Sequence, residues 1–253
     1  MNNIERRQTI LGYLREKGSV NTIDLAKELN VSSMTIRRDL SRFADEGIVS
    51  LEYGGAILID GSLHELSMNM KQDERQQEKQ RIAAYCAQRV HNGDTVFLDA
   101  GTTVAEIAKL LTHHSDLTVM THSLLVANIL ANASDVRLIM CPGIFRSKSM
   151  AFMGQLTDDF VSSFKIDTLF LGVEGVEVDH GTSTPDVTDG ITKTALVNAS
   201  SQIICAADSS KIGKITFYSI CPIRDITTLV TDKNVDPAQV RALEENGLEV
   251  ILA

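Results

Sequence analysis

Residues 20–55 constrain the fold of this chain more than any other segment, because their pattern predicts two short helices, a tight turn and a two-stranded wing. Apolar residues at helical spacing mark one face of each helix, namely Leu25, Ala26 and Leu29 on the first and Ile36, Leu40 and Phe43 on the second. An earlier helix predicted at residues 5–17, with Ile10, Leu11 and Leu14 facing inward, completes a three-helix unit. The N-terminal part of the chain therefore predicts a winged helix-turn-helix domain.

The outer face of the second helix carries the residues that we expect to contact DNA. They are Thr35, Arg37, Arg38 and Arg42, together with Ser32 and Ser33, one of which is expected to cap the helix. Arginine suits guanine edges and phosphate oxygens, and hydroxyls near the helix start reach phosphates or bases. The alternative is an ordinary solvated face on which Asp39 pairs with an arginine. The preceding helix and the wing at residues 48–55 favour DNA binding.

Composition and charge favour duplex DNA over single strands. Aromatic residues make up 5% of the 253 residues and tryptophan is absent, which leaves little stacking surface for unpaired bases. The net charge is −9, but residues 1–43 hold eight basic and five acidic residues, whereas the rest of the chain holds 16 basic and 28 acidic ones. This modestly basic unit on an acidic body predicts weak non-specific binding. One such unit per chain favours a homo-oligomer, a dimer or a tetramer.

The cysteines and the N-terminal residues give no indication of a metal, a cofactor or a membrane. Cys86, Cys141, Cys205 and Cys221 lie far apart and form no CxxC or Cys/His cluster, so each is expected to be a buried small hydrophobe. The first residues are polar, and no apolar run reaches the roughly 18 residues of a membrane span. We therefore expect a cytoplasmic protein with no metal site, no cofactor and no membrane partner.

The composition divides the chain into two domains. We expect a DNA-binding domain at residues 1–57 with the helix-turn-helix at about 20–39, a linker at 58–73, and a second domain at 74–253. In the second domain, strands are expected at 95–98, 117–120, 136–141, 168–173, 202–207, 226–231 and 248–252, and helices at 73–90, 103–112, 123–132, 155–164 and 236–246. This alternation predicts a Rossmann-like α/β domain with a mostly parallel sheet.

Polar residues directly follow several of these predicted strands. Ligands of open α/β sheets bind at the carboxyl ends of the strands. The candidates are therefore Asp99, Gly101, Thr102, Thr103, Thr121, His122, Ser123, Gly143, Glu174, Asp208, Ser210 and Lys211. The helix start at 101–103 offers N–H groups to a phosphate, and Lys211 beside carboxylates suits a small anionic polyol. Singly, these residues fit a capped turn, a packed histidine or a solvated lysine. Their convergence on one rim favours a ligand site.

Both halves of the chain resemble the DeoR family of bacterial transcriptional regulators. The recognition-helix signature corresponds to residues 31–40, VSSMTIRRDL, and the wing signature to residues 54–56, GGA. In the second half, the family stretches correspond to residues 98–103, 119–123, 172–175, 184–193 and 207–211. The wing departs from the family, because Glu52 and Tyr53 stand where basic residues and a histidine are usual.

The resemblance implies a repressor of a sugar or sugar-alcohol catabolic operon that a phosphorylated sugar releases from DNA. It implies that Asp99, Gly101, Thr102, Thr103, Ser123 and Lys211 touch the ligand, and it adds Lys193 to the effector site. The stretch 141–156 is similar to the glucitol operon repressor branch, which implies a hexitol phosphate. His122, Pro142 and Asp189 depart from the family pattern and leave the identity of the effector open.

Other functions are open to a chain of this pattern. The second domain resembles ribose-5-phosphate isomerase A, so a sugar-phosphate isomerase is a rival. Its strand end at residues 171–175 keeps at most one of the three carboxylates that the isomerase supplies for proton transfer. A purely architectural DNA protein would have no use for the polar rim. Activation of transcription instead of repression remains an alternative.

Overall fold

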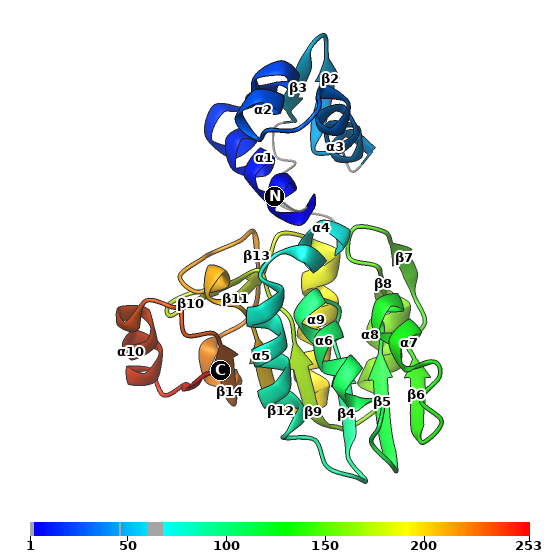
Figure 1. Ribbon diagram of the computed structural model, residues 1–253. Coiled ribbons are helices and arrows are strands. Elements are labelled where there is room, and N and C mark those ends of the chain that lie inside the picture. The colour runs from blue at the N-terminus through cyan, green and yellow to red at the C-terminus, as the bar shows by residue number, and fades with distance from the viewer. Residues whose placement is uncertain (1–2, 46, 60–67) are drawn as a thin grey trace. The chain divides into compact units, whose positions relative to one another are not determined.

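The computed structural model describes residues 3–45, 47–59 and 68–253, and the chain forms two compact units, Met1–Glu74 and Arg75–Ala253 (Figure 1). The expected linker at 58–73 falls partly on residues 60–67, which lie outside the described residues. Its described part holds the end of strand β3 and the short helix α4 (Met68–Asp73).

Within the N-terminal unit, the described residues before position 60 form three helices and a small antiparallel sheet. Its elements are α1 (Asn3–Lys17), β1 (Ser19–Asn21), α2 (Thr22–Glu28), α3 (Ser33–Asp45), β2 (Val49–Glu52) and β3 (Gly55–Leu58). The strand order is β1-β3-β2, so the predicted two-stranded wing gains a third strand, β1. The apolar faces that the helical spacing predicts, Ile10, Leu14, Ile36, Leu40 and Phe43 among them, form one buried core.

Local interactions fix the turn between α2 and α3. The Asn21 side chain accepts hydrogen bonds from the backbone N–H groups of Ile23 and Asp24 and so caps the start of α2. Asn30 adopts a left-handed conformation after α2, and Ser32 Oγ accepts from Thr35 N at 3.2 Å. Ser32, and not Ser33, is thus the residue that caps α3.

The second unit is built on a seven-stranded parallel sheet in the order β15-β14-β12-β9-β4-β5-β6. The strands are β4 (Thr95–Leu98), β5 (Leu117–Thr121), β6 (Val136–Met140), β9 (Ile166–Leu171), β12 (Ser200–Ala206), β14 (Thr228–Thr231) and β15 (Glu249–Leu252). Each corresponds to a predicted apolar run, and the Rossmann-like α/β architecture is confirmed.

Helices cover both faces of this sheet (Figure 1). Apolar residues of α5 (Gln76–Ala87), α6 (Thr102–Leu111) and α7 (Leu124–Leu130) form one core with the sheet. Apolar residues of α8 (Gln155–Ser162), α9 (Val187–Ala199) and α10 (Pro237–Glu245) belong to the core on the other face. The four cysteines are buried in these cores and form no disulfide.

Three features of the second unit were not predicted. Helix α9 is one, and the antiparallel hairpin of β7 (Ile144–Arg146) and β8 (Ala151–Met153) is another. The third is a small antiparallel sheet of β10 (Gly175–Glu177), β11 (Gly181–Thr184) and β13 (Tyr218–Cys221), in that order. Short helical turns lie at η2 (Ser209–Lys211) and η3 (Ile223–Asp225). Among the described residues, every helix is too short or too polar to span a membrane.

The strand order reverses between β4 and β9. The chain runs outward from β4 through β5 to β6, and then returns to place β9 on the other side of β4. Parallel sheets of this kind bind ligands in the crevice at such a switch point, outside the carboxyl ends of the strands. We therefore expect a ligand site at the residues that directly follow β4 and β9.

Candidate functional site

The outer face of α3 presents the six residues predicted to contact DNA. Ser32, Ser33, Arg37, Arg38 and Arg42 are exposed and Thr35 is partly exposed. Ile36, Leu40 and Phe43 on the opposite face are buried in the core. Among the described residues, Arg37, Arg38 and Arg42 make no ion pair, so their guanidinium groups remain available to an outside partner. The geometry matches a recognition helix.

Asp39 pairs with arginines of α1 and leaves those of α3 unpaired. Arg6 Nε lies 2.6 Å from Asp39 Oδ2, and Arg7 Nε lies 3.1 Å from Asp39 Oδ1. Asp39 and Arg6 are buried. The charge of Asp39 therefore stabilises the packing of α1 on α3, and the alternative of a pair within α3 does not hold.

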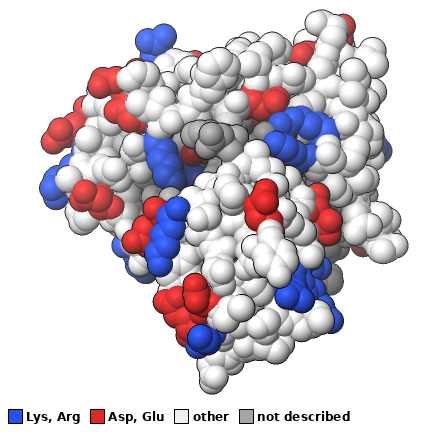
Figure 2. Space-filling view, turned by 90° about the horizontal axis from the view of Figure 1, so that it is seen from above, with Lys and Arg blue, Asp and Glu red and all other residues white. Residues whose placement is uncertain are grey.

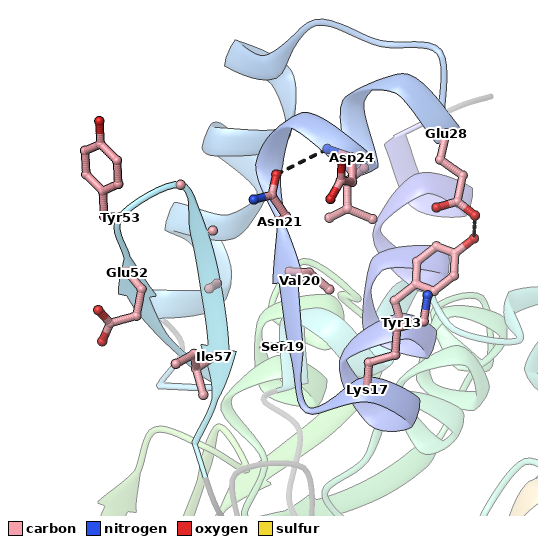
Figure 3. Close-up of a pocket in the computed structure, with 14 residues that line it drawn as sticks. Tyr13, Lys17, Ser19, Val20, Asn21, Asp24, Glu28, Glu52, Tyr53 and Ile57 are labelled. Carbon is pink, nitrogen blue, oxygen red and sulfur yellow. Dashed lines mark hydrogen bonds between the residues drawn. The ribbon is translucent and has the colours of Figure 1, made fainter.

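A groove of about 420 Å³ lies on another side of this unit (Figure 3). Its lining comes from α1, β1, α2 and the wing, and none of it from α3. Three carboxylates, Asp24, Glu28 and Glu52, stand against one lysine, Lys17. Tyr13 bonds to Glu28, and Lys17 lies over the Tyr13 ring at 4.8 Å. The negative lining makes this groove unsuited to phosphate, whether of DNA or of a sugar.

Basic side chains do not form one continuous band on the face shown in Figure 2. Groups of Lys and Arg alternate there with acidic and uncharged residues. A surface of this kind predicts that DNA affinity depends on a few well-placed arginines more than on overall charge.

In the second unit, a buried polar network occupies the switch point. Asp99, directly after β4, is 0% exposed and bonds to the Lys193 ammonium from α9. Backbone N–H groups also donate to it, from Ala100 at 2.7 Å and from Gly172, after β9, at 2.9 Å. Lys193 Nζ donates in turn to Gly172 O at 3.0 Å. The network ties β4, β9 and α9 together where the sheet reverses.

His122 extends the network to the β7–β8 hairpin. Its Nε2 lies 2.9 Å from Asp99 Oδ1 and its Nδ1 lies 2.9 Å from Phe152 O. The backbone N–H of Ala100 also lies 3.3 Å from His122 Nε2, so the ring contacts both sides of the turn after β4. The predicted effector residue His122 is thus fully buried, and its ring contacts Asp99 and the hairpin.

Charge pairing outweighs burial at Asp99. Burial by itself raises the pKa of this carboxyl, but the Lys193 ammonium and His122 hold the pKa at about 2. At Lys193, burial lowers the pKa, and Asp189 and Asp99 more than offset it, so the pKa is raised. Burial raises the pKa of Asp189, which lies 3.8 Å from Lys193 and accepts from Thr184 Oγ1 at 2.6 Å.

The low pKa of Asp99 predicts an acid-dependent loss of stability. The folded pKa of about 2 lies below the usual aspartate pKa of 3.8, so the stabilisation is present above about pH 4 and is lost as the pH falls toward 2. Urea unfolding of the wild type and of Asp99→Asn should differ most near pH 6 and should converge below about pH 4. A difference that stays constant down to pH 3 would contradict a stabilising Asp99 carboxylate.

The start of α6 is a part of the rim that no side chain caps, and Thr102 and Thr103 there are 7% and 8% exposed. Gly101, with φ of 148°, precedes the helix, and no side chain caps it. Thr102 and Thr103 occupy the first turn, and their hydroxyls bond to no other described residue. Uncapped N–H groups at a helix start attract anions through their hydrogen bonds and the helix dipole.

Other predicted residues of the rim are already engaged within the protein. Thr121 Oγ1 donates to Leu98 O at 2.6 Å and accepts from Ser123 N at 3.0 Å. Ser123 Oγ accepts from Val126 N at 3.3 Å and caps α7. A Cβ on Gly143 would lie 2.3 Å from Thr157 Oγ1, so this glycine serves the packing of the hairpin. These residues shape the rim.

An ion pair closes the β9 and β12 side of the rim. Lys211 Nζ donates to Glu174 Oε2 at 2.6 Å, and both side chains are partly exposed. Asp208 accepts a hydrogen bond from Ser210 N at 3.0 Å. Arg75 lies beside it, with its Nε 3.7 Å from Asp208 Oδ1, and donates to Ser209 Oγ at 3.3 Å. Sequence reasoning missed Arg75, Thr184, Asp189 and Phe152 as members of this site. Arg75 and Phe152 contact segments distant in sequence, whereas Thr184 and Asp189 lie in the family stretch 184–193 and bond to each other.

Comparison with known proteins matches both units. Residues 6–62 match the model of the DeoR-like helix-turn-helix domain, and residues 74–233 match the DeoR C terminal sensor domain. A putative aga operon transcriptional repressor of Escherichia coli O157:H7 is 33% identical, over 98% of this chain and 93% of that protein. The glycerol-3-phosphate regulon repressor of Escherichia coli K12 is 31% identical over the full length of both chains.

Among solved structures, ribose 5-phosphate isomerase A of Methanocaldococcus jannaschii is similar to part of the chain. The TM-score is 0.41 and the identity 13%, over 55% of each chain.

Proposed function

The chain belongs to the DeoR family of sugar-operon transcriptional repressors, and we propose that it represses its operon through α3 until a phosphorylated sugar or hexitol binds the second unit. As a member of this family it is a regulator and not an enzyme, as the sequence predicted. Its proposed DNA partner is operator duplex, which a regulator meets in the cytoplasm.

The single observation that carries the ligand proposal is the uncapped start of α6 at the sheet's switch point. Thr102 and Thr103 offer two hydroxyls beside the first N–H groups of the helix. Three phosphate oxygens match such a group of donors, and the helix dipole favours their charge. A neutral sugar would leave these donors without a charged partner, so we expect it to bind poorly.

Lys211 and Glu174 supply the second half of the proposed site. Their ion pair lies at the ends of β9 and η2 and keeps both groups partly exposed. Lys211 can reach a phosphate or a hydroxyl when the pair opens, and Glu174 can then accept from a hydroxyl. The buried Asp99–His122–Lys193 network fixes the ends of β4 and β9 beside this ion pair.

Coupling to DNA follows from linkage. A ligand that favours the form unable to bind DNA must bind less tightly to the DNA-bound protein, by a coupling free energy of about 1–3 kcal/mol for a useful switch. Arg75, at the start of the second unit, contacts Asp208 and Ser209 of the rim. We infer that this contact connects the effector site to the chain leading to the DNA-binding unit.

Calorimetric titration with hexose and hexitol phosphates tests the effector site. Thr102→Val/Lys211→Ala should raise the dissociation constant roughly 30-fold or more, because it removes one neutral and one charged hydrogen-bond donor. The matched control is Thr112→Val/Lys165→Ala. Thr112 stands at the far end of α6 and Lys165 just before β9, at the amino end of the sheet.

We expect the control variant to bind the sugar phosphate as tightly as the wild type does. The sugar phosphate should release operator DNA from the wild type and from the control variant. Absence of binding by every phosphorylated sugar, or equal binding by the double variant, would contradict the proposed effector site.

A further inference from the structure

Large apolar side chains lie exposed around the β7–β8 hairpin. Ile144 is 76% exposed on β7, and Leu156 is 64% exposed on α8. The hairpin surface, as we call this region, comprises Leu124, Ile144, Phe145, Leu156, Val187 and Ile191. Figure 1 shows β7, β8, α7 and α8 on the side of the sheet that ends in β6.

Specific contacts hold these side chains in one continuous region. Leu124 N donates to Met150 O at 2.8 Å, which fixes the start of α7 against the hairpin turn. Arg146 Nη2 lies 3.1 Å from Asp186 Oδ2, directly before Val187 and α9. Thr157 Oγ1 donates to Pro142 O at 2.6 Å, which places α8 at the base of the hairpin. Three helix ends therefore surround the hairpin.

The apolar area of this surface is about two thirds of what a stable interface buries on each partner. A large apolar residue exposes about 150–200 Å² when fully accessible, so the six residues present roughly 500–600 Å². A standard interface buries about 800 Å² on each partner, and the largest apolar patch of a monomer rarely exceeds about 600 Å². Backbone and polar atoms between the six side chains would supply the remainder.

The charges around the surface allow a second copy to approach. The chain carries a net charge of −9, so most of its surface would repel a copy. Beside the hairpin, Arg146 pairs with Asp186 at 3.1 Å, so this ion pair brings both signs of charge and no net charge to the surface. A two-fold axis places the same patch on both partners, and a neutral patch with both signs of charge can face itself.

We propose that the hairpin surface is covered by the hairpin surface of a second copy of this chain. The proposal rests on the proposed function, because each chain carries one recognition helix and operator binding by this class of motif uses two related by symmetry. Association through the second unit would bring two DNA-binding units to one operator. The same contact would hold Phe152 O, the partner of His122, close to the interface.

Light scattering and sedimentation of the full-length chain test the proposal. The wild type should have the mass of a dimer or a multiple of it, and Ile144→Asp/Leu156→Asp should lower the mass to half or less at the same concentration. The control, Leu110→Asp/Leu252→Asp, places the same charges at exposed apolar residues of α6 and β15 and should keep the wild-type mass. A monomeric wild type, or an unchanged mass of the hairpin variant, would overturn the proposal.

A labelling assay covers the case in which the charged variant fails to fold. The four native cysteines are buried, so Ile144→Cys adds a thiol that a bulky maleimide can address selectively. Labelling should slow at least tenfold at high protein concentration relative to high dilution, whereas Leu110→Cys should react equally at both. Equal rates for Ile144→Cys at both concentrations would count against the surface. Operator binding by the wild type, measured alongside, separates this outcome from a failure of the proposed function.

Discussion

Replacing Arg37 and Arg38 together by alanine is expected to weaken operator binding by about 1–3 kcal/mol for each arginine that contacts a base, without loss of fold. Both side chains are exposed, and neither pairs with another described residue. The charge that α3 does use for packing is that of Asp39, which binds Arg6 and Arg7. The two arginines therefore contribute to binding and little to stability.

Fluorescence anisotropy with operator and random duplexes measures this loss at several salt concentrations. Lys17→Ala/Lys27→Ala is the matched control, because it removes the same two charges from α1 and α2. An arginine bound to a base should affect the operator more than the random duplex, whereas one bound to phosphate should weaken both and lower the salt slope by about 1. If the arginine variant bound its operator as tightly as the wild type does, α3 would not be the helix that recognises the operator.

Local periodicity predicted the helices and strands that bury one continuous apolar face. It placed the cores of α2 and α3 and the seven parallel strands, because in each of them burial alone determines the pattern. It could not reveal the partner of Asp39, since Arg6 lies 33 residues away on another helix. The residue pattern of a single helix does not show which distant residue its side chains contact.

Helix α9 was missed because its residues are poor helix formers. The helix contains Gly190 and several β-branched residues, which disfavour helix when taken locally. Tertiary contacts determine it instead. The Asp186 side chain caps the start of α9 by accepting a hydrogen bond from Asp189 N at 2.9 Å. A Cβ on Gly190 would lie 2.1 Å from the Tyr218 ring, so glycine alone permits the packing of α9 on β13.

The rim of the candidate site was predictable, but the role of each residue on it was not. Parallel strands end at one edge whatever their contacts, and this is why Asp99, Thr121 and Glu174 could be grouped. Thr102 and Thr121 look alike in sequence. In the structure, the hydroxyl of Thr121 is bound to Leu98 O, whereas that of Thr102 has no partner among the described residues. Thr121 ends β5 opposite Leu98, whereas Thr102 begins α6.

Replacing Lys193 by methionine should destabilise the second unit by about 3–5 kcal/mol, the usual effect of removing one partner of a buried ion pair. Asp99 would keep its charge at 0% exposure with the ammonium gone, and His122 and two N–H groups would have to hold it alone. Urea unfolding at pH 7 measures the change. Lys109→Met is the control, because its partner Glu106 lies at 2.6 Å but Lys109 itself is 44% exposed, so a loss below about 1 kcal/mol is expected.

The double variant Asp99→Asn/Lys193→Met distinguishes a charge effect from a packing effect. If the stranded carboxylate causes the loss, neutralising it should recover part of the stability, and the two single losses should exceed the loss in the double variant. If methionine merely packs badly beside Gly172, the losses should add. Additive losses, or a Lys193→Met variant as stable as the wild type, would show that the switch-point network does not hold the strand ends on which the proposed effector site depends.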